Sequence, residues 1–281
     1  MTSDDRRMAS EGAGGTPVSD EHPTFDTSMA HQARVYNYWL GGKDNYEADR
    51  AAGEAAIEAY PNIVFSVRAN RAFLARVVHY LAGEMGIRQF LDIGTGIPTA
   101  SNTHEVAQAV APDSRIVYVD NDPVVLAHAR ALLASSPEGD TDYIDADLRD
   151  TRVILDQAAR TLDFSQPVAV MLIAILQVIG DADDPYGIVT TLMDAAAPGS
   201  YLALSHVASD IDAEKVAEAT KRVNRLRPQK GTLRGQAQVA RFFDGLDLVE
   251  PGVVRVPEWR PGSEIEAKTP SAMWGGVGHK R

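Results

Sequence analysis

The stretch FLDIGTGIPT, Phe90 to Thr99, joins a short apolar run to a glycine turn, and it decides which fold we predict. Gly94 and Gly96 allow a sharp turn and a close approach of the backbone to a ligand, which is half of the dinucleotide fingerprint G-x-G-x-x-G. Thr99 occupies the third glycine position of that fingerprint. Asp92 would repel a pyrophosphate but would attract a ligand that carries an amino group and a sulfonium. The motif therefore favours a cationic ligand over NAD.

Predicted strands and helices alternate along the chain from Arg88 onward. The predicted strands are RQFLDIG, SRIVYVD, DYIDADLRD, PVAVMLIAIL and SYLALSHV, with further strands near LDLVEPG and AMWGGVG. Between them, DPVVLAHARALLASS is typical of a helix with Asp122 as N-cap and Pro123 at its first position. The alternation predicts an α/β fold, with a doubly wound, mostly parallel, seven-stranded Rossmann-like sheet. Its ligand would bind at the carboxyl ends of the strands.

Three regions are predicted along the chain. Residues 1–28 are polar and almost without apolar side chains, which is typical of a disordered tail. Residues 29–86 contain a short helix broken at Gly41 and Gly42, an alanine-rich helix from about Tyr46, and a stronger amphipathic helix closed by Gly86. The aromatic, glycine-hinged segment RVYNYWLGGKDNY suits a lid over the carboxyl edge of the sheet. Residues 87–281 form the sheet domain.

Composition limits the possible partners and location. The chain has 281 residues, 44% of them hydrophobic, and a net charge of −12 from 39 acidic and 27 basic residues. This charge disfavours a general affinity for nucleic acid or an anionic membrane. Cysteine is absent, which excludes disulfides and thiolate metal sites, and we expect no metal. No apolar run reaches the roughly 20 residues that span a bilayer, so we expect a cytoplasmic protein. The oligomeric state does not follow from the sequence.

Two further acids follow predicted strands. Asp120 ends the second strand, where a carboxylate is placed to accept hydrogen bonds from both hydroxyls of a ribose. Asp147, in DADL, is placed to accept from an adenine amino group while the Leu148 backbone N–H meets a ring nitrogen. The alternative is that both acids cap helices or lie in solvated turns. Acids at three successive strand ends, including Asp92, favour an adenosine ligand.

The order of these motifs resembles a known group of enzymes. DIGTG, YVDNDP, ADL, a strand running into AILQVI, and PGSYLALSH resemble the motifs of class I S-adenosylmethionine-dependent methyltransferases. The segments ARVYNYWLGGKDNYEADR, ANRAFL, NTHEVAQ, VYVDNDPVVLAHARALL, DLRD and LVEPGVVRVPEWRP are similar to a narrower, actinobacterial family of S-adenosyl methyltransferases. This resemblance covers Met29 to the C-terminus.

The resemblance implies S-adenosylmethionine as cofactor and transfer of its methyl group, but it brings no substrate. We expect the acceptor to be an unidentified small molecule. The resemblance also implies that the methionine portion lies against four residues of the glycine turn, the ribose against one acid, and the adenine against three residues. These are Asp92, Gly94, Thr95 and Gly96, then Asp120, then Asn121, Asp147 and Leu148. Pro98 departs from the broad superfamily and would start the next helix with a fixed φ.

A general base is needed only if the acceptor is protonated, and it must lie near the transferring methyl. The candidates are His206, Tyr38, Tyr36 and His104. For His206 the alternative is a histidine satisfied by a backbone group at a strand end, and for His104 an exposed helix face.

Two other function classes are compatible with parts of the pattern. One is a non-catalytic regulator or sensor that binds S-adenosylmethionine or its demethylated product, and the other is an NAD(P)-dependent oxidoreductase. The charge at Asp92 disfavours the oxidoreductase.

Overall fold

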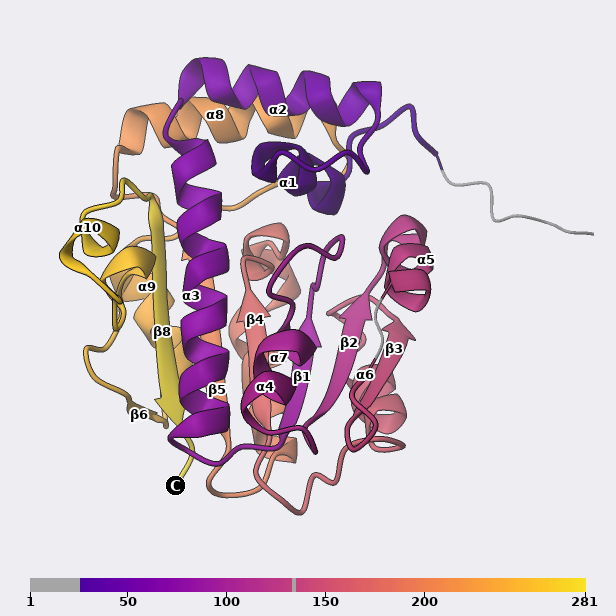
Figure 1. Cartoon of the computed structure of the whole chain (residues 1–281). Helices are drawn as coiled ribbons and strands as arrows, with labels where there is room; N and C mark the ends of the chain where they lie inside the picture. Colours follow the sequence, from indigo (N-terminus) through magenta and orange to yellow (C-terminus); the bar gives the residue numbers. More distant parts are fainter. Residues whose placement is uncertain (1–25, 133–134) are drawn as a thin grey trace, which may run out of the picture.

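A mainly parallel sheet runs through the protein (Figure 1). The structure is a computed structural model that describes residues 26–132 and 135–281. Within these residues the sheet has eight strands, seven of them in the order β3-β2-β1-β4-β5-β8-β6, with β7 pairing β8 off this path. The parallel strands are β1 (Gln89–Ile93), β2 (Arg115–Asp120), β3 (Asp140–Asp145), β4 (Ala169–Ile173) and β5 (Tyr201–Val207). The antiparallel strands are β6 (Asp247–Leu248), β7 (Val254–Arg255) and β8 (Met273–His279).

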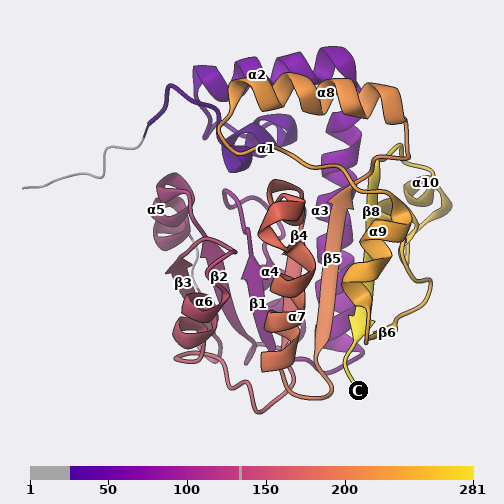
Figure 2. The ribbon, with the colours of Figure 1, turned by 180° about the vertical axis from the view of Figure 1, so that it is seen from behind.

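Helices cover both faces of the sheet. Figure 1 shows α3 (Ile63–Gly83) and α4 (Thr103–Val110) in front of the strands. Figure 2, from behind, shows α6 (Thr151–Ala158), α7 (Pro185–Ala195) and α9 (Gln236–Ala240) on the other face. Every residue of β1 and β4 is buried, as expected of parallel strands covered on both sides. The predicted doubly wound α/β class is confirmed, but β7 was not predicted, because two residues are too few for a periodic pattern.

The helix after the glycine turn begins later than predicted. Asn102 caps α4: its side-chain oxygen accepts from the Thr99 N–H at 3.1 Å, and its own N–H donates to Glu105 at 2.8 Å. Because this cap starts the helix at Thr103, Pro98 lies in the preceding loop. The prediction that Pro98 starts the helix was wrong. The predicted cap of α5 (Pro123–Leu132) is present, since Asp122 accepts from the Val124 N–H at 2.9 Å.

A third layer lies over the carboxyl ends of the strands. It consists of α1 (Gln32–Leu40), α2 (Glu47–Ala59) and α8 (Ala213–Leu226), with α2 and α8 side by side in both views (Figures 1 and 2). Its buried side chains, including Val35, Trp39, Val216 and Val223, form a separate apolar cluster. The helices of the predicted lid are therefore present, although the packing of α8 against them was not foreseen. Residues 1–25 of the predicted tail lie outside the described residues.

The contact between α1 and α2 depends on the absence of a side chain at Gly53. A Cβ there would lie 2.4 Å from Cδ1 of Tyr38, and the Gly53 carbonyl accepts a hydrogen bond from Nε1 of Trp39 at 3.2 Å. We expect Gly53→Ala to lower the free energy of unfolding by about 1–3 kcal/mol through overpacking. Urea denaturation monitored by tryptophan fluorescence measures this change.

Gly83→Ala, in α3, is the matched control. Its Cβ would lie 3.4 Å from Cγ1 of Val110, an ordinary contact. We expect no loss of stability there, because alanine is favoured over glycine in helices by up to about 1 kcal/mol. Equal effects of the two substitutions would contradict the close contact at Gly53.

Candidate functional site

A cavity opens at the carboxyl ends of β1, β2 and β4, beneath α1. It encloses about 980 Å³ of atom-free space, including its opening to solvent. All eight binding residues predicted from the sequence line it: Asp92, Gly94, Thr95, Gly96, Asp120, Asn121, Asp147 and Leu148. They meet because β1, β2 and β3 are neighbours in the sheet.

The glycine turn after β1 is held against β2. Gly94 has φ +77°, and its N–H donates to the Val119 carbonyl at 2.8 Å. A Cβ on Gly94 would lie 2.4 Å from Cγ1 of Ile175, so this position excludes a side chain. Gly96 has φ +68°, and its N–H donates to Oδ2 of Asp120 at 2.9 Å. The turn and the acid that ends β2 therefore form one unit.

Asp92 is a buried carboxylate at the base of the cavity. Its side chain is only 4% exposed, and Oδ2 accepts a hydrogen bond from the Thr103 hydroxyl at 2.6 Å. Burial raises the pKa of Asp92 to about 6, although the Thr103 hydrogen bond opposes this rise. Asp92 binds its proton more tightly in the folded protein than in the unfolded chain. Its ionisation therefore lowers the free energy of unfolding as the pH rises toward 6. A cation bound beside it would favour the ionised form.

Asp120 and Asp147 make turn hydrogen bonds and also line the cavity. The Asp122 N–H donates to Oδ1 of Asp120 at 3.0 Å, and burial raises the pKa of Asp120. Asp147 lies two residues beyond the end of β3, where it accepts from the Asn121 side chain at 3.0 Å and from Arg149. The geometry is thus compatible with both interpretations: acids that contact a ribose and an adenine, and acids that hold turns.

Some lining residues were not foreseen because they come from distant segments. Arg71, on α3, lines the cavity and donates to the carbonyls of Ala100 at 3.2 Å and Ser101 at 3.0 Å. The Nε of Arg71 has no hydrogen-bond partner among the described residues. Gln229, from the loop after α8, lines the cavity as well. Arg71 lies in ANRAFL and Gln229 in none of the quoted motifs, and the fold brings both to the cavity.

His206 is a core residue of β5. It is fully buried, and it lies outside the lining of the cavity. Its Nδ1 lies 2.9 Å from the Val207 carbonyl, and its Nε2 accepts from Arg234 at 2.9 Å. Burial lowers the pKa of His206 to about 4. The geometry favours the alternative from the sequence, a histidine satisfied by neighbouring groups.

The other three candidate bases differ in position. Tyr38 lies outside the lining and donates to Glu54. His104 was expected on an exposed helix face, which was wrong: it is 4% exposed, with Nδ1 2.8 Å from the Tyr118 hydroxyl. Tyr36 does line the cavity, where its hydroxyl donates to the Val67 carbonyl at 3.1 Å and accepts from Asn70 at 2.9 Å.

Comparison with known proteins identifies the family. A family model described as S-adenosyl methyltransferase matches residues 19–281. The chain belongs to this family. It is 46% identical to a DUF574 family protein of solved structure from Streptomyces avermitilis, covering 91% of this chain and 99% of that one with a TM-score of 0.88. A candidate methyltransferase from Thermobifida fusca is 41% identical, covering 91% and 97% with a TM-score of 0.83. Among curated proteins, none matches.

The family assignment confirms the predicted enzyme class and cofactor. The chain is an S-adenosylmethionine-dependent methyltransferase, and the sensor and the NAD(P)-dependent oxidoreductase are set aside. The cavity fits the cofactor, because buried carboxylates suit its cationic groups and the unpaired Nε of Arg71 suits its carboxylate. Among the described residues, no helix is long and apolar enough to cross a membrane. That part of the chain also has no group of three or more His, Cys, Asp or Glu placed for a metal.

Asp120→Asn tests the predicted ribose contact. We expect a loss of about 10- to 100-fold in affinity for S-adenosylmethionine, because hydrogen bonds to a charged group contribute about 1.5–3 kcal/mol. Isothermal titration calorimetry measures the affinity. Asp145→Asn is the control, because Asp145 pairs with Asp120 in the sheet register but does not line the cavity. An unchanged affinity in Asp120→Asn would exclude this role.

The buried carboxylates also predict a pH dependence of binding. The pKa of Asp92 is raised to about 6, so the free protein becomes protonated there as the pH falls through 6. Binding of a cation favours the ionised carboxylate. As the pH falls below 6, the affinity for S-adenosylmethionine should therefore decrease by at most about tenfold per pH unit through this group. Calorimetry between pH 5 and pH 8 measures the slope. Asp92→Asn should bind more weakly at pH 7.5 and show a shallower slope, and equal slopes would refute the assignment.

Proposed function

We propose that the eight lining residues bind S-adenosylmethionine in the order expected from the sequence. Asp92 and the turn from Gly94 to Gly96 would hold the methionine portion, and Asp120 the ribose. Asn121, Asp147 and Leu148 would hold the adenine. The proposal is supported by the cavity, which brings all eight together along three neighbouring strand ends.

The chemistry requires little acid or base from the protein. When bound, the cofactor would supply an activated methyl group. The acceptor's nucleophilic atom would bond to the methyl carbon as the sulfur–methyl bond breaks, and the electron pair of that bond would stay on sulfur. A proton on the acceptor would pass to water. The chain's task is to align the two molecules and to exclude bulk water. Asp92 would favour the cation, and Tyr36 on α1, which lines the cavity, would help to close the site.

We propose residues 29–60 as a lid that encloses the cofactor. His31, Gln32, Ala33 and Tyr36, near the start of α1 or on it, line the cavity, which supports this role. The sequence predicted a region of residues 29–86 that contains the lid and α3 and precedes the sheet domain. The proposed lid is the first part of that region.

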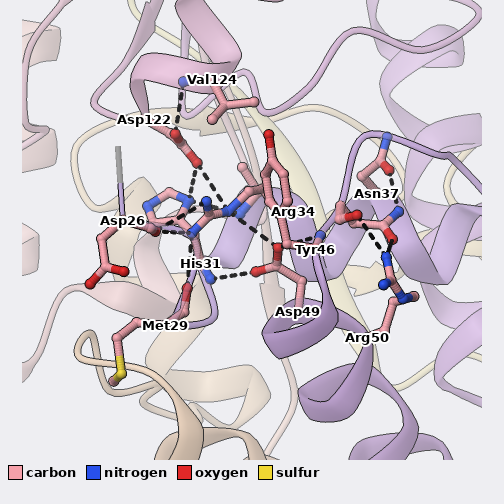
Figure 3. A network of polar contacts seen from close by, with 12 residues as sticks. Asp26, Met29, His31, Arg34, Asn37, Tyr46, Asp49, Arg50, Asp122 and Val124 are labelled. Atoms are coloured by element: carbon pink, nitrogen blue, oxygen red, sulfur yellow. Dashed lines mark hydrogen bonds and ion pairs between the residues drawn. The ribbon is translucent and has the colours of Figure 1, made fainter. Parts of the chain in front are cut away.

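A buried charge network holds the proposed lid in place (Figure 3). The Nε of Arg34 lies 3.4 Å from Asp49 on α2 and 3.7 Å from Asp122 at the start of α5. The Nδ1 of His31 lies 2.7 Å from Asp122. Burial alone would raise the pKa of Asp122, but the His31 hydrogen bond and the nearby charges lower it. Asp122 follows the ribose acid Asp120 by two residues, so the network couples the lid to the site.

The lid proposal extends the test on Gly53. If α1 and α2 enclose the cofactor, Gly53→Ala should weaken S-adenosylmethionine binding, whereas Gly83→Ala should not. Unchanged cofactor affinity in a destabilised Gly53→Ala protein would refute the lid.

We further propose that the acceptor is a small molecule, because the helical layer covers the carboxyl ends of the strands (Figure 1). The two cavities beneath this layer open to solvent but are limited in size. The net charge of −12 also disfavours nucleic acid as the acceptor. A cytoplasmic location and an actinobacterial origin stay predictions.

The class of acceptor can be tested with methyl-labelled cofactor. The enzyme is incubated with a cell extract that is then separated into small molecules, protein and nucleic acid. We expect the label in the small-molecule fraction, with transfer reduced in Asp120→Asn and retained in Asp145→Asn. Label confined to protein or nucleic acid would overturn the small-molecule proposal.

A further inference from the structure

A second cavity lies beside the first, beneath the same helical layer. It encloses about 690 Å³ of atom-free space, including its opening to solvent. Gln32, Tyr36 and Ala174 line both cavities. Because these residues form a shared wall, a molecule in the second cavity would lie next to a cofactor in the first.

Most of the wall of the second cavity is apolar or aromatic. It is built by α1, the start of α3, α8 and the segment leading into β8. Its apolar and aromatic side chains include Trp39, Tyr60, Ile63, Val67, Val216 and Val223. Such a wall suits an apolar body, since removing apolar surface from water is favourable.

Arg227 is the exception in this apolar setting. It is the only charged residue among the described residues that line the second cavity, and it is 4% exposed. Within the described chain, no carboxylate lies within 4.0 Å of its guanidinium nitrogens. Burial lowers the pKa of Arg227 to about 10, with no acidic neighbour to oppose the effect. A buried cation of this kind is costly unless a partner arrives.

One edge of the Arg227 guanidinium makes fewer hydrogen bonds than its donors allow. Its Nη1 donates to Oε1 of Gln32, while Nη2 makes only a long contact of 3.4 Å to Oδ1 of Asn224. Its Nε has no partner. The Nε and Nη2 groups lie on the same edge of the guanidinium plane, which is the edge that binds a carboxylate through two parallel hydrogen bonds.

Gln177 supplies a second unpaired polar atom to this cavity. It is 4% exposed, and its Nε2 donates to the carbonyl of Ala174 in the shared wall. Its Oε1 has no partner. A buried acceptor without a donor is costly, so a hydroxyl or N–H on the occupant would satisfy it.

We infer that the second cavity is the acceptor site and that the acceptor is a small, largely apolar carboxylate, held by Arg227 and by a donor group that meets Gln177. The inference rests on the proposed function, in which the first cavity holds the cofactor. Arg71 lines that first cavity and Arg227 does not, so the two guanidinium groups, each with an Nε that has no partner among the described residues, would serve different ligands.

The test uses full-length enzyme saturated with S-adenosylhomocysteine, the demethylated product. Calorimetry compares benzoate, 4-hydroxybenzoate and indole-3-acetate with their primary amides, which keep the shape but lack the charge. We expect at least one carboxylate to bind about tenfold or more tightly than its amide. Arg227→Gln should abolish the difference, whereas Arg225→Gln, an exposed neighbour on α8, should retain it. Arg227→Gln should also raise the melting temperature of the ligand-free enzyme, because it removes an unpaired buried charge.

Each other outcome overturns part of the scheme in a distinguishable way. If no carboxylate binds more tightly than its amide, or if Arg227→Gln leaves the preference intact, the inference fails. Tighter binding of phenyl phosphate than of benzoate would replace the carboxylate by a phosphate ligand. Loss of S-adenosylhomocysteine binding in Arg227→Gln would assign Arg227 to the cofactor. Failure of the wild-type enzyme to bind S-adenosylhomocysteine would instead refute the proposed function.

Discussion

The hydrogen bond from the Gly96 N–H to the Asp120 carboxylate is the contact on which the site depends. It ties the glycine turn after β1 to the end of β2, and the parallel pairing of these strands brings the two segments together. The same turn keeps Gly94 against Ile175, beyond the end of β4. Together with β3, these strands present their carboxyl ends to one cavity, and the residues that would contact the methionine, ribose and adenine portions follow the sheet order β1, β2, β3.

Burial shifts the pKa values of several charged groups of the two cavities toward the neutral form, and the hydrogen bonds that these groups make offset the shift only in part. Asp92 and Asp120 have pKa values raised by burial, and Arg227 has a pKa lowered by it. Each would gain stability from an opposite charge or a hydrogen-bonding partner on a ligand. The ligand-free protein therefore holds several charges in an unfavourable environment, and binding of cofactor and acceptor would relieve that cost. At these positions, groups that lower the stability of the ligand-free protein would increase its affinity for the cofactor and the acceptor.

The helical layer connects this chemistry to the N-terminal part of the chain. Arg34 lies between Asp49 and Asp122, so α1, α2 and the start of α5 share one buried charge network. Tyr36 adds a second link, because its hydroxyl accepts from Asn70, whose side-chain oxygen accepts from Ser205 on β5. The α1 helix thereby contacts both cavities and is hydrogen-bonded, through α3, to the centre of the sheet.

The sequence by itself determined the α/β class, most strand positions and eight of the residues that line the first cavity, because strand periodicity and the glycine turn are local features. It failed at single positions, through an unrecognised helix cap in one case and through tertiary contacts in the others. Pro98 lies in a loop because Asn102 caps α4, and His206 is buried because Arg234 and the core enclose it. Arg71 and Gln177 lie within ANRAFL and AILQVI, and Arg227 lies in none of the quoted motifs, but only the tertiary structure decided that these side chains line cavities. Whether a polar or charged side chain is buried without a partner depends on the segments that pack around it, and this is settled only when the chain folds.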